Sequence, residues 1–293
     1  MAHPRAQQAR ELWRHAEPVH AVTYFSAEPL SALRSAGYKG FWMGYFAGRA
    51  APLGPASPEL VRALFHNFSA DHVARSLPDA WAFAPPAAAL AARVDGSVAA
   101  LLRMLGERLD ERAVGRAAEL ALRAAESAPV DGRALFAANR ALPAPTEPLA
   151  RLWHAATLLR EHRGDGHVAA LTAADIGGRE AHVLHALSSG TPASVYAAAR
   201  HLDAQEWSAL VDGLARRGLV DPAAGLTEAG RELKERVEQQ TDVLAASALA
   251  VLADEEVAEL IALLRPVSAA VVASGDIPRK SPMGLDLGPR PAL

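Results

Sequence analysis

The sequence predicts an all-α protein, in which a helical bundle is followed by a winged helix-turn-helix with one small β-hairpin. Hydrophobic residues make up 51% of the chain, with much alanine and only 5% aromatic residues. Alanine favours helices and lets them pack closely. A pattern typical of paired short strands occurs around Leu219–Leu226. The 293 residues are enough for two domains.

The N-terminal part is expected to be a series of helices. Its first helix ends near Pro18, because proline lacks the amide hydrogen that a helix interior needs. Another helix begins after Ser57, whose side chain can cap the free amide groups at a helix start. Two alanine-rich amphipathic stretches, residues 87–105 and 111–125, are typical of an antiparallel helix bundle.

A proline-rich connector, ALPAPTEP at residues 141–148, marks a boundary in the chain. Beyond it lies a histidine-bearing helix, and after about residue 177 the pattern changes again. We expect five parts: an N-terminal helical domain (1–145), the histidine-bearing helix and turn packed on it (146–177), a winged helix-turn-helix (178–247), a C-terminal helix (248–274) and a flexible tail (275–293).

Glycines and aromatic residues are interspersed in the segment GFWMGYFAGRAAPLG, residues 40–54. Gly40, Gly44 and Gly48 recur every four residues, so a helix here has a smooth strip on which a neighbouring helix can pack. Tight helix packing alone does not account for the polar residues in and near this segment, since buried phenol and imidazole groups need hydrogen-bond partners. These residues are His20, Tyr24, Tyr38, Tyr45 and Arg49.

The segment LWHAATLLREHRGDGH, residues 152–167, holds three of the eleven histidines, two carboxylates and two arginines. Its leucines predict a helix that ends at the glycines of the segment. His154 and Glu161 are seven residues apart, so they lie within about 20° of each other on the helix surface. A glycine turn would bring His167 back toward the helix end, near His162.

Three interpretations of this cluster stay open. Imidazoles with a carboxylate can hold zinc, iron, copper or a haem, and the ligands would be His154, His162 and His167. The same region can instead form a pocket for a small-molecule ligand, lined by His20, Tyr24, Tyr45, Arg49, His154 and Glu161. In the third interpretation the arginines cap a helix end and the histidine is hydrogen-bonded in the core.

Residues 178–240 read as helices, a short strand, a tight turn, a return strand and a final helix. The run LVDGLARRGLVD is followed by LTEAGRELKERVE, in which Thr-x-x-Gly caps the last helix. This pattern resembles the MarR-type winged helices. Through HAVTYF, GFWMGYFAGRAAPLG and LWHAATLLREHRGDGH, the whole chain is also similar to a family of actinobacterial helix-turn-helix proteins. The resemblance implies DNA binding.

The charges of this segment do not favour DNA. Residues 176–240 contain seven Lys or Arg and nine Asp or Glu residues, whereas a DNA-binding protein usually neutralises phosphates with clustered cations. The expected recognition helix carries Asp203 and Glu206 in its first turn, the part that enters the major groove. The residues left to contact DNA are Arg200, Gln205, Ser208, Arg216 and Arg217.

Composition limits the function classes. The absence of cysteine excludes disulfides and thiolate metal sites, and a net charge of −3 gives no general attraction to nucleic acid or to a membrane surface. The polar N-terminal segment predicts no secretory signal and no apolar run predicts a membrane span, so we expect a cytoplasmic protein. The apolar positions in residues 232–247 and 254–272 favour a homodimer, because they exceed what one small winged helix can cover.

No established catalytic motif occurs, since the chain lacks a Walker loop, a dinucleotide-binding glycine motif, Gly-x-Ser-x-Gly and His-Glu-x-x-His. The sequence therefore favours a ligand- or metal-responsive transcriptional regulator with a winged-helix output domain. One alternative is a metal- or haem-dependent enzyme, or a small-molecule-binding biosynthetic protein, whose winged helix no longer binds DNA. Another is an interaction module whose wing binds protein.

Overall fold

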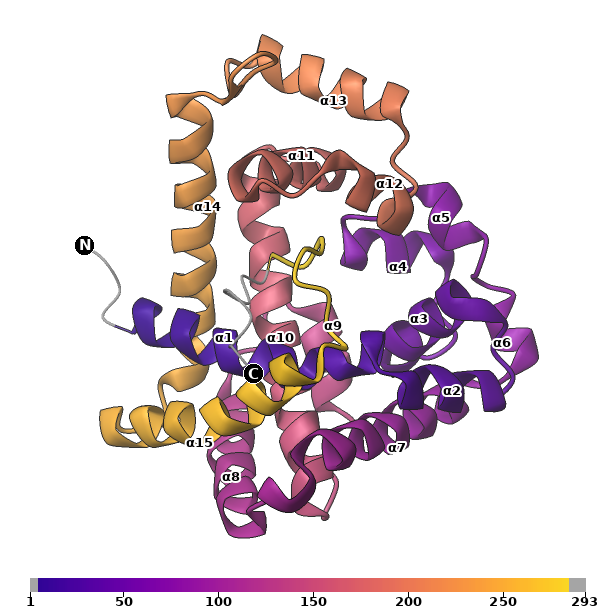
Figure 1. The fold of residues 1–293 in the computed structure, drawn as a ribbon, viewed down its shortest axis with the longest axis vertical. Helices are drawn as coiled ribbons and strands as arrows, with labels where there is room; N and C mark the ends of the chain where they lie inside the picture. Colours follow the sequence, from indigo (N-terminus) through magenta and orange to yellow (C-terminus); the bar gives the residue numbers. More distant parts are fainter. Residues whose placement is uncertain (1–4, 285–293) are drawn as a thin grey trace.

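The computed structural model describes residues 5–284. Within this range the protein is almost wholly helical and has one small two-stranded sheet, as the sequence predicts (Figure 1). The elements are α1 (Ala6–Phe25), α2 (Ala27–Ser35), α3 (Gly40–Ala50), α4 (Pro58–Phe65), α5 (Ala70–Ala74), α6 (Ala80–Phe83), α7 (Pro86–Leu105), α8 (Glu111–Ser127), α9 (Ala134–Arg140), α10 (Pro148–Ala173), α11 (Gly178–Ser189), α12 (Ala193–Arg200), α13 (Ala204–Arg216), β1 (Val220–Asp221), β2 (Gly225–Leu226), α14 (Glu228–Ala246) and α15 (Asp254–Ser274).

Helix α10 is the central element of the bundle. It packs against α8, α14, α1, α9 and α7, and most of its 26 residues are buried. Leu152, Trp153 and Leu158 lie in the main hydrophobic core. The buried residues of α10 lie on all sides of the helix, and five neighbouring helices cover them.

The glycines of α10 do not end the helix, so the predicted turn is wrong. A Cβ on Gly166 would lie 2.8 Å from Nη1 of Arg133 and 3.2 Å from Cβ of Leu244. Arg133 also donates a hydrogen bond to the carbonyl oxygen of Leu244, at 3.0 Å. Glycine at this position therefore lets α14 and Arg133 approach the helix. Helix α1 likewise continues through Pro18 to Phe25, where we expected an end.

Two local predictions for the N-terminal part are confirmed. The Ser57 side chain accepts a hydrogen bond from the amide of Leu60 at 3.3 Å, which caps α4. Leu33 of α2 packs on the glycine strip of α3, because a Cβ on Gly44 or on Gly48 would lie 3.5 Å from its side chain. Gly44 and Gly48 of the strip thus allow α2 to pack closely on α3.

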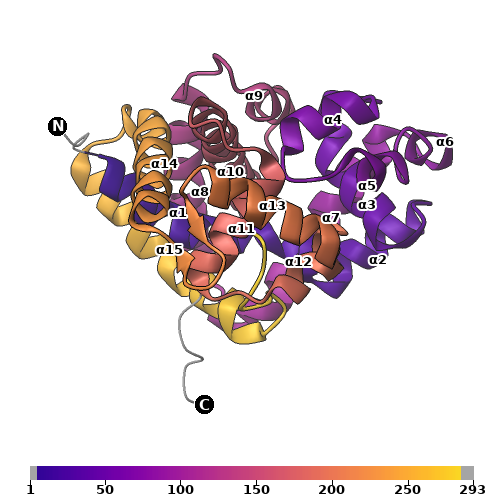
Figure 2. The same cartoon turned by 90° about the horizontal axis from the view of Figure 1, so that it is seen from above.

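Helices α11 to α14 and the hairpin form the helix-turn-helix unit. In the hairpin Val220 pairs with Leu226 and Asp221 with Gly225. The Thr227 side chain accepts a hydrogen bond from the amide of Gly230 at 3.1 Å, which is the expected cap of α14. Seen from above, α14 and the α3–α6 group lie on opposite sides of α11 and α12 (Figure 2).

The C-terminal helix is covered within the chain. Helix α15 packs on α1, α8 and α7, and Leu260, Leu264 and Val271 are in the core. It is the one described helix that is long and apolar enough to cross a membrane by length and composition. Other helices of the same chain cover the buried apolar residues of α14 and α15. The homodimer that we expected from these residues stays a prediction.

The segment after α15 is packed, not free, as far as the structure describes it. Ile277 is 4% exposed, and Lys280 Nζ donates a hydrogen bond to the carbonyl oxygen of Gly190 at 3.2 Å. Residues 275–284 therefore lie packed against the fold, and the remainder of the expected tail, 285–293, lies outside the described residues.

Candidate functional site

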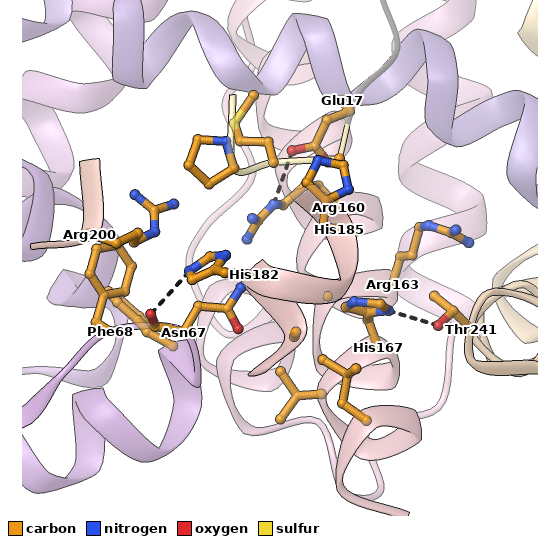
Figure 3. A pocket seen from close by; sticks show the side chains of 18 of the residues that line it. Glu17, Asn67, Phe68, Arg160, Arg163, His167, His182, His185, Arg200 and Thr241 are labelled. Atoms are coloured by element: carbon orange, nitrogen blue, oxygen red, sulfur yellow. Dashed lines mark hydrogen bonds and ion pairs between the residues drawn. The ribbon is translucent and has the colours of Figure 1, made fainter. Parts of the chain in front are cut away.

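A cavity of about 760 Å³ lies between the N-terminal bundle and the helix-turn-helix unit (Figure 3). Helices α1, α3 and α10 and the α4–α5 region line one side of it, and α11, α12 and α14 line the other. Pro282, Met283 and Gly284 also contribute to its wall. Small-molecule sites commonly have volumes of roughly 300 to 1,000 Å³, so the cavity has the size of such a site.

One wall of the cavity is aromatic. The rings of Tyr24 and Tyr45 lie 5.1 Å apart between centroids, and those of Tyr45 and Phe68 lie 5.6 Å apart. A continuous aromatic surface binds flat or apolar groups by contact and stacking. The aromatic residues that line the cavity near this wall are Tyr24, Phe25, Phe41, Trp42, Tyr45, Phe65 and Phe68.

The structure brings most of the predicted pocket residues together. Tyr24, Tyr45 and Arg49 line the cavity. His20 lies behind this wall, with its Nε2 at 2.9 Å from the hydroxyl of Tyr24 and its Nδ1 at 2.9 Å from Oγ1 of Thr157. It therefore orients a wall residue, and a direct role in ligand binding stays a prediction.

Glu161 also lies behind the wall, as a partner of two arginines. Its side chain is 3% exposed, accepts a hydrogen bond from Nη1 of Arg160 at 2.7 Å and lies 3.6 Å from Nε of Arg49. The buried carboxyl group loses solvation, but the two guanidinium groups outweigh this and lower its pKa to about 2. Glu161 is therefore ionised and fixes both arginines at the cavity.

The predicted metal ligands do not converge. His154 and His167 are thirteen residues apart on one continuous helix, which separates them by about 20 Å along its axis. His167 Nδ1 lies 2.9 Å from Oγ1 of Thr241, and the His162 ring packs on Phe136 at 4.9 Å. Between residues 5 and 284, no three His, Cys, Asp or Glu side chains are grouped so that they could hold a metal ion. The prediction of a metal site from these histidines is therefore wrong.

His154 and His162 are structural in the folded chain. Neither lines the cavity. Burial, with a smaller contribution from nearby arginines, lowers the pKa of His154 to about 4 and that of His162 to about 3. Both imidazoles are thus neutral near pH 7. His154 was also predicted to line the ligand pocket, and the structure places it outside.

Charged residues at the α14 end of the cavity are paired with one another. Nη1 of Arg163 lies 2.7 Å from Oδ1 of Asp242, and Nε of Arg10 lies 2.5 Å from Oδ2 of the same residue. Nζ of Lys234 lies 3.6 Å from Oε1 of Glu238. These ion pairs connect α1, α10 and α14, and each of the three cations lies within ion-pair distance of a carboxylate.

Arg200, which we expected to contact DNA, instead enters the cavity (Figure 3). Its guanidinium carbon lies 4.4 Å from the centre of the Phe68 ring, and Nη1 donates a hydrogen bond to the carbonyl oxygen of Ala199 at 2.8 Å. Because α12 ends against the bundle, its last side chain points inward. The assignment of Arg200 to DNA contacts is wrong.

The outer face of α13 keeps three of the residues that we assigned to DNA. Gln205, Ser208 and Arg216 are exposed, and α13 lies at one end of the molecule (Figure 1). Arg217 forms an ion pair with Glu180 of α11, in which its Nη1 lies 3.2 Å from Oε1. Whether these residues contact DNA stays a prediction.

The carboxylates of the first turn of α13 have partners. Asp203 is the N-cap, and its Oδ1 accepts a hydrogen bond from the amide of Glu206 at 2.8 Å. Glu206 pairs with Arg179 of α11, whose Nε donates to Oε1 at 2.8 Å. The negative charge that seemed to oppose DNA in the sequence is therefore partly neutralised within the unit.

Two histidines that line the cavity were not among the predicted site residues. His182 and His185 of α11 both line the cavity. Nε2 of His182 lies 3.2 Å from the carbonyl oxygen of Asn67, so this nitrogen carries a proton and ties α11 to the bundle. Their spacing of three residues places both on one helix face, which was the available signal.

Of three comparisons of this chain with known proteins, one finds a match. A search among curated proteins and among solved structures finds no match to it. The model of a helix-turn-helix family matches residues 9–278, so both the bundle and the winged unit are part of the family pattern. The chain therefore belongs to this helix-turn-helix family.

Proposed function

We propose that this protein is a ligand-responsive DNA-binding regulator. One observation carries the proposal: α11 and α12 form a wall of the cavity, while α13, the next helix, carries its polar face on the outside. A molecule in the cavity would contact the same unit that presents α13. Membership of a helix-turn-helix family supports the DNA-binding half of the proposal.

The exposed side chains of α13 suit base contacts. Glutamine side chains can bind adenine, and arginine side chains can bind guanine, through paired hydrogen bonds in the major groove. Gln205, Ser208 and Arg216 are spaced so that they share one helix face. Asp212 lies between them and is the exposed carboxylate on this face. Its negative charge would repel DNA phosphates, so we expect no phosphate contact at the middle of the helix.

The order of the elements supports the likeness to MarR-type winged helices. Three helices, a two-stranded wing and a long helix follow each other in α11, α12, α13, β1, β2 and α14. The wing tip is small, because Asp221 closes it by accepting hydrogen bonds from the amides of Ala223 and Ala224. DNA contacts would thus come mainly from α13. A role on DNA is also in keeping with the cytoplasmic location that we expect.

The experiment is a DNA-affinity measurement. A DNA site is selected from a random duplex library, and its dissociation constant is measured by fluorescence anisotropy at several salt concentrations. We expect Arg216→Ala to bind about ten times more weakly, the loss typical of one bidentate base contact. The control is Arg112→Ala, which removes an exposed arginine of α8. Helix α8 lies at the opposite end of the molecule from α13 (Figure 1).

Two results would overturn the proposal. One is failure of the selection to enrich any duplex even at low salt, where electrostatic binding is strongest. The other is equal DNA affinity for wild type, Arg216→Ala and a Gln205→Ala variant. The alternative of a metal-dependent enzyme loses the ligand set that the sequence suggested, because His154, His162 and His167 do not converge.

A further inference from the structure

The charge inside the cavity indicates which class of ligand it takes. Nε of Arg200 is buried and has no hydrogen-bond partner. Of the arginines that line the cavity, Arg200 alone has no carboxylate within ion-pair distance among the residues that the structure describes. A buried guanidinium group loses its hydration, and an anion or hydrogen-bond acceptors must compensate for that loss.

Arg49 is incompletely matched at the same end of the cavity. Its Nε is buried without a hydrogen-bond partner, since the 3.6 Å to Oε1 of Glu161 is longer than a hydrogen bond. Its guanidinium carbon lies 4.0 Å from the centre of the Phe65 ring. Like Arg200, Arg49 therefore lies over an aromatic ring and has an Nε–H group that donates no hydrogen bond.

The guanidinium groups of Arg49 and Arg200 lie over adjacent aromatic rings. They stack on Phe65 and Phe68, whose ring centroids are 6.3 Å apart. Burial lowers the pKa of Arg200, and repulsion from the charge of Arg49 lowers it further. Two like charges on adjacent rings repel each other unless an anion lies between them.

The arginines at this end differ in their ion pairs. Arg49 and Arg160 pair with the carboxylates of Glu17 and Glu161, whereas Arg200 lies within ion-pair distance of neither. At the α14 end of the cavity, Arg10, Arg163 and Lys234 share Asp242 and Glu238, and each of the three cations lies within ion-pair distance of at least one of these carboxylates. The cavity arginine without a carboxylate partner among the described residues, Arg200, therefore lies beside the aromatic wall, over the ring of Phe68.

We propose that the cavity binds a small organic anion, a carboxylate or a phosphate ester with an aromatic or other apolar body, whose charged group lies between Arg200 and Arg49. The aromatic wall takes the apolar body. The proposal deepens the proposed function by naming the class of ligand for the same cavity. Because Arg200 belongs to the helix-turn-helix unit and Arg49 to the bundle, the anion would bridge the two.

The test uses matched probes and the full-length protein without DNA. The probes are 1-naphthylacetate, its neutral analogue 1-naphthylacetamide, 1-naphthyl phosphate and inorganic phosphate alone. Binding is measured by isothermal titration calorimetry. We expect at least one naphthyl anion to bind tenfold or more tightly than the amide, as expected for hydrogen bonds to a charged group. The two anions distinguish a carboxylate site from a phosphate site.

Variants locate the charged group. Arg200→Gln should remove most of the preference for the anion over the amide, and Arg200→Lys, which keeps the charge, should retain part of it. Arg14→Gln is the matched control, because Arg14 lines the same cavity but is paired with Glu11 at 3.3 Å. Melting temperatures measured in parallel identify a variant that has not folded, and Arg49→Gln then replaces it.

Three results would overturn the proposal: no binding of either naphthyl anion at millimolar concentration, equal affinity for the anions and the amide, or an unchanged preference in folded Arg200→Gln and Arg49→Gln. Binding of inorganic phosphate as tight as that of 1-naphthyl phosphate would also count against it, because the apolar body would then contribute nothing. Since no DNA is present, these outcomes are independent of whether α13 binds DNA.

Discussion

Replacement of Gly178 by alanine tests how the helix-turn-helix unit docks on the bundle. Gly178 is the first residue of α11, and a Cβ there would lie 2.0 Å from the carbonyl oxygen and 2.5 Å from the carbonyl carbon of His66. Asn67 Cα would lie 3.0 Å away. All three are backbone atoms, so no side-chain rotation can relieve the overlap. The carbonyl oxygen would have to move by about 1.4 Å to reach ordinary contact at 3.4 Å.

The expected cost follows from this displacement. Extra atoms forced into well-packed contacts cost about 1 to 3 kcal/mol, so Gly178→Ala should lower the free energy of unfolding by about 2 kcal/mol. For a chain of this size that corresponds to a melting temperature lower by roughly 4 °C. The displacement of the backbone at His66 and Asn67 should also weaken the hydrogen bond between His182 and the carbonyl oxygen of Asn67.

The matched control is Gly115→Ala, a glycine in α8 whose added Cβ would meet nothing within 4 Å. Because alanine is the better helix former by roughly 1 kcal/mol, this variant should be more stable than wild type. Both variants are compared by urea denaturation and by thermal melting. If Gly178→Ala proves as stable as Gly115→Ala, the unit is not docked through the contact described above.

Two further predictions concern buried charge and pH. Glu161→Gln should lower the free energy of unfolding by about 3 to 5 kcal/mol in urea denaturation, because Arg49 and Arg160 lose their buried carboxylate; wild-type stability would contradict the ion-pair assignment. Stability should also fall as pH drops from about 6.5 toward 4, since the unfolded chain binds protons at His154 and His162 before the folded protein does. His162→Gln should flatten this slope, and an identical slope in the variant would show that His162 is not buried as a neutral ring.

Local patterns predicted the fold well. The cap at Ser57, the packing strip at Gly44 and Gly48 and the hairpin at Leu219–Leu226 depend on residues close together in the sequence, and all three occur in the structure. The same holds for the all-helical class, because alanine content and helical periodicity act within each helix.

The site was predicted less well, because it depends on how distant elements meet. Gly166 resembles a helix stop in the sequence, and only the approach of Arg133 and Leu244 shows that it is a packing position. Arg200 resembles a DNA contact until α12 is seen to end against the aromatic wall. His182 gave a usable signal through its spacing to His185, but no sequence feature says that this face meets Asn67.

The central claim is that occupation of the cavity changes how α13 binds DNA. The most direct test measures the DNA dissociation constant with and without a saturating amount of whichever naphthyl anion binds more tightly, in wild type and in Arg200→Gln. Coupling between two sites typically changes affinity by a factor of five or more. We predict such a change in wild type, in either direction, and less than a twofold change in Arg200→Gln. Equal DNA affinity of the wild type with and without the bound anion would contradict the account.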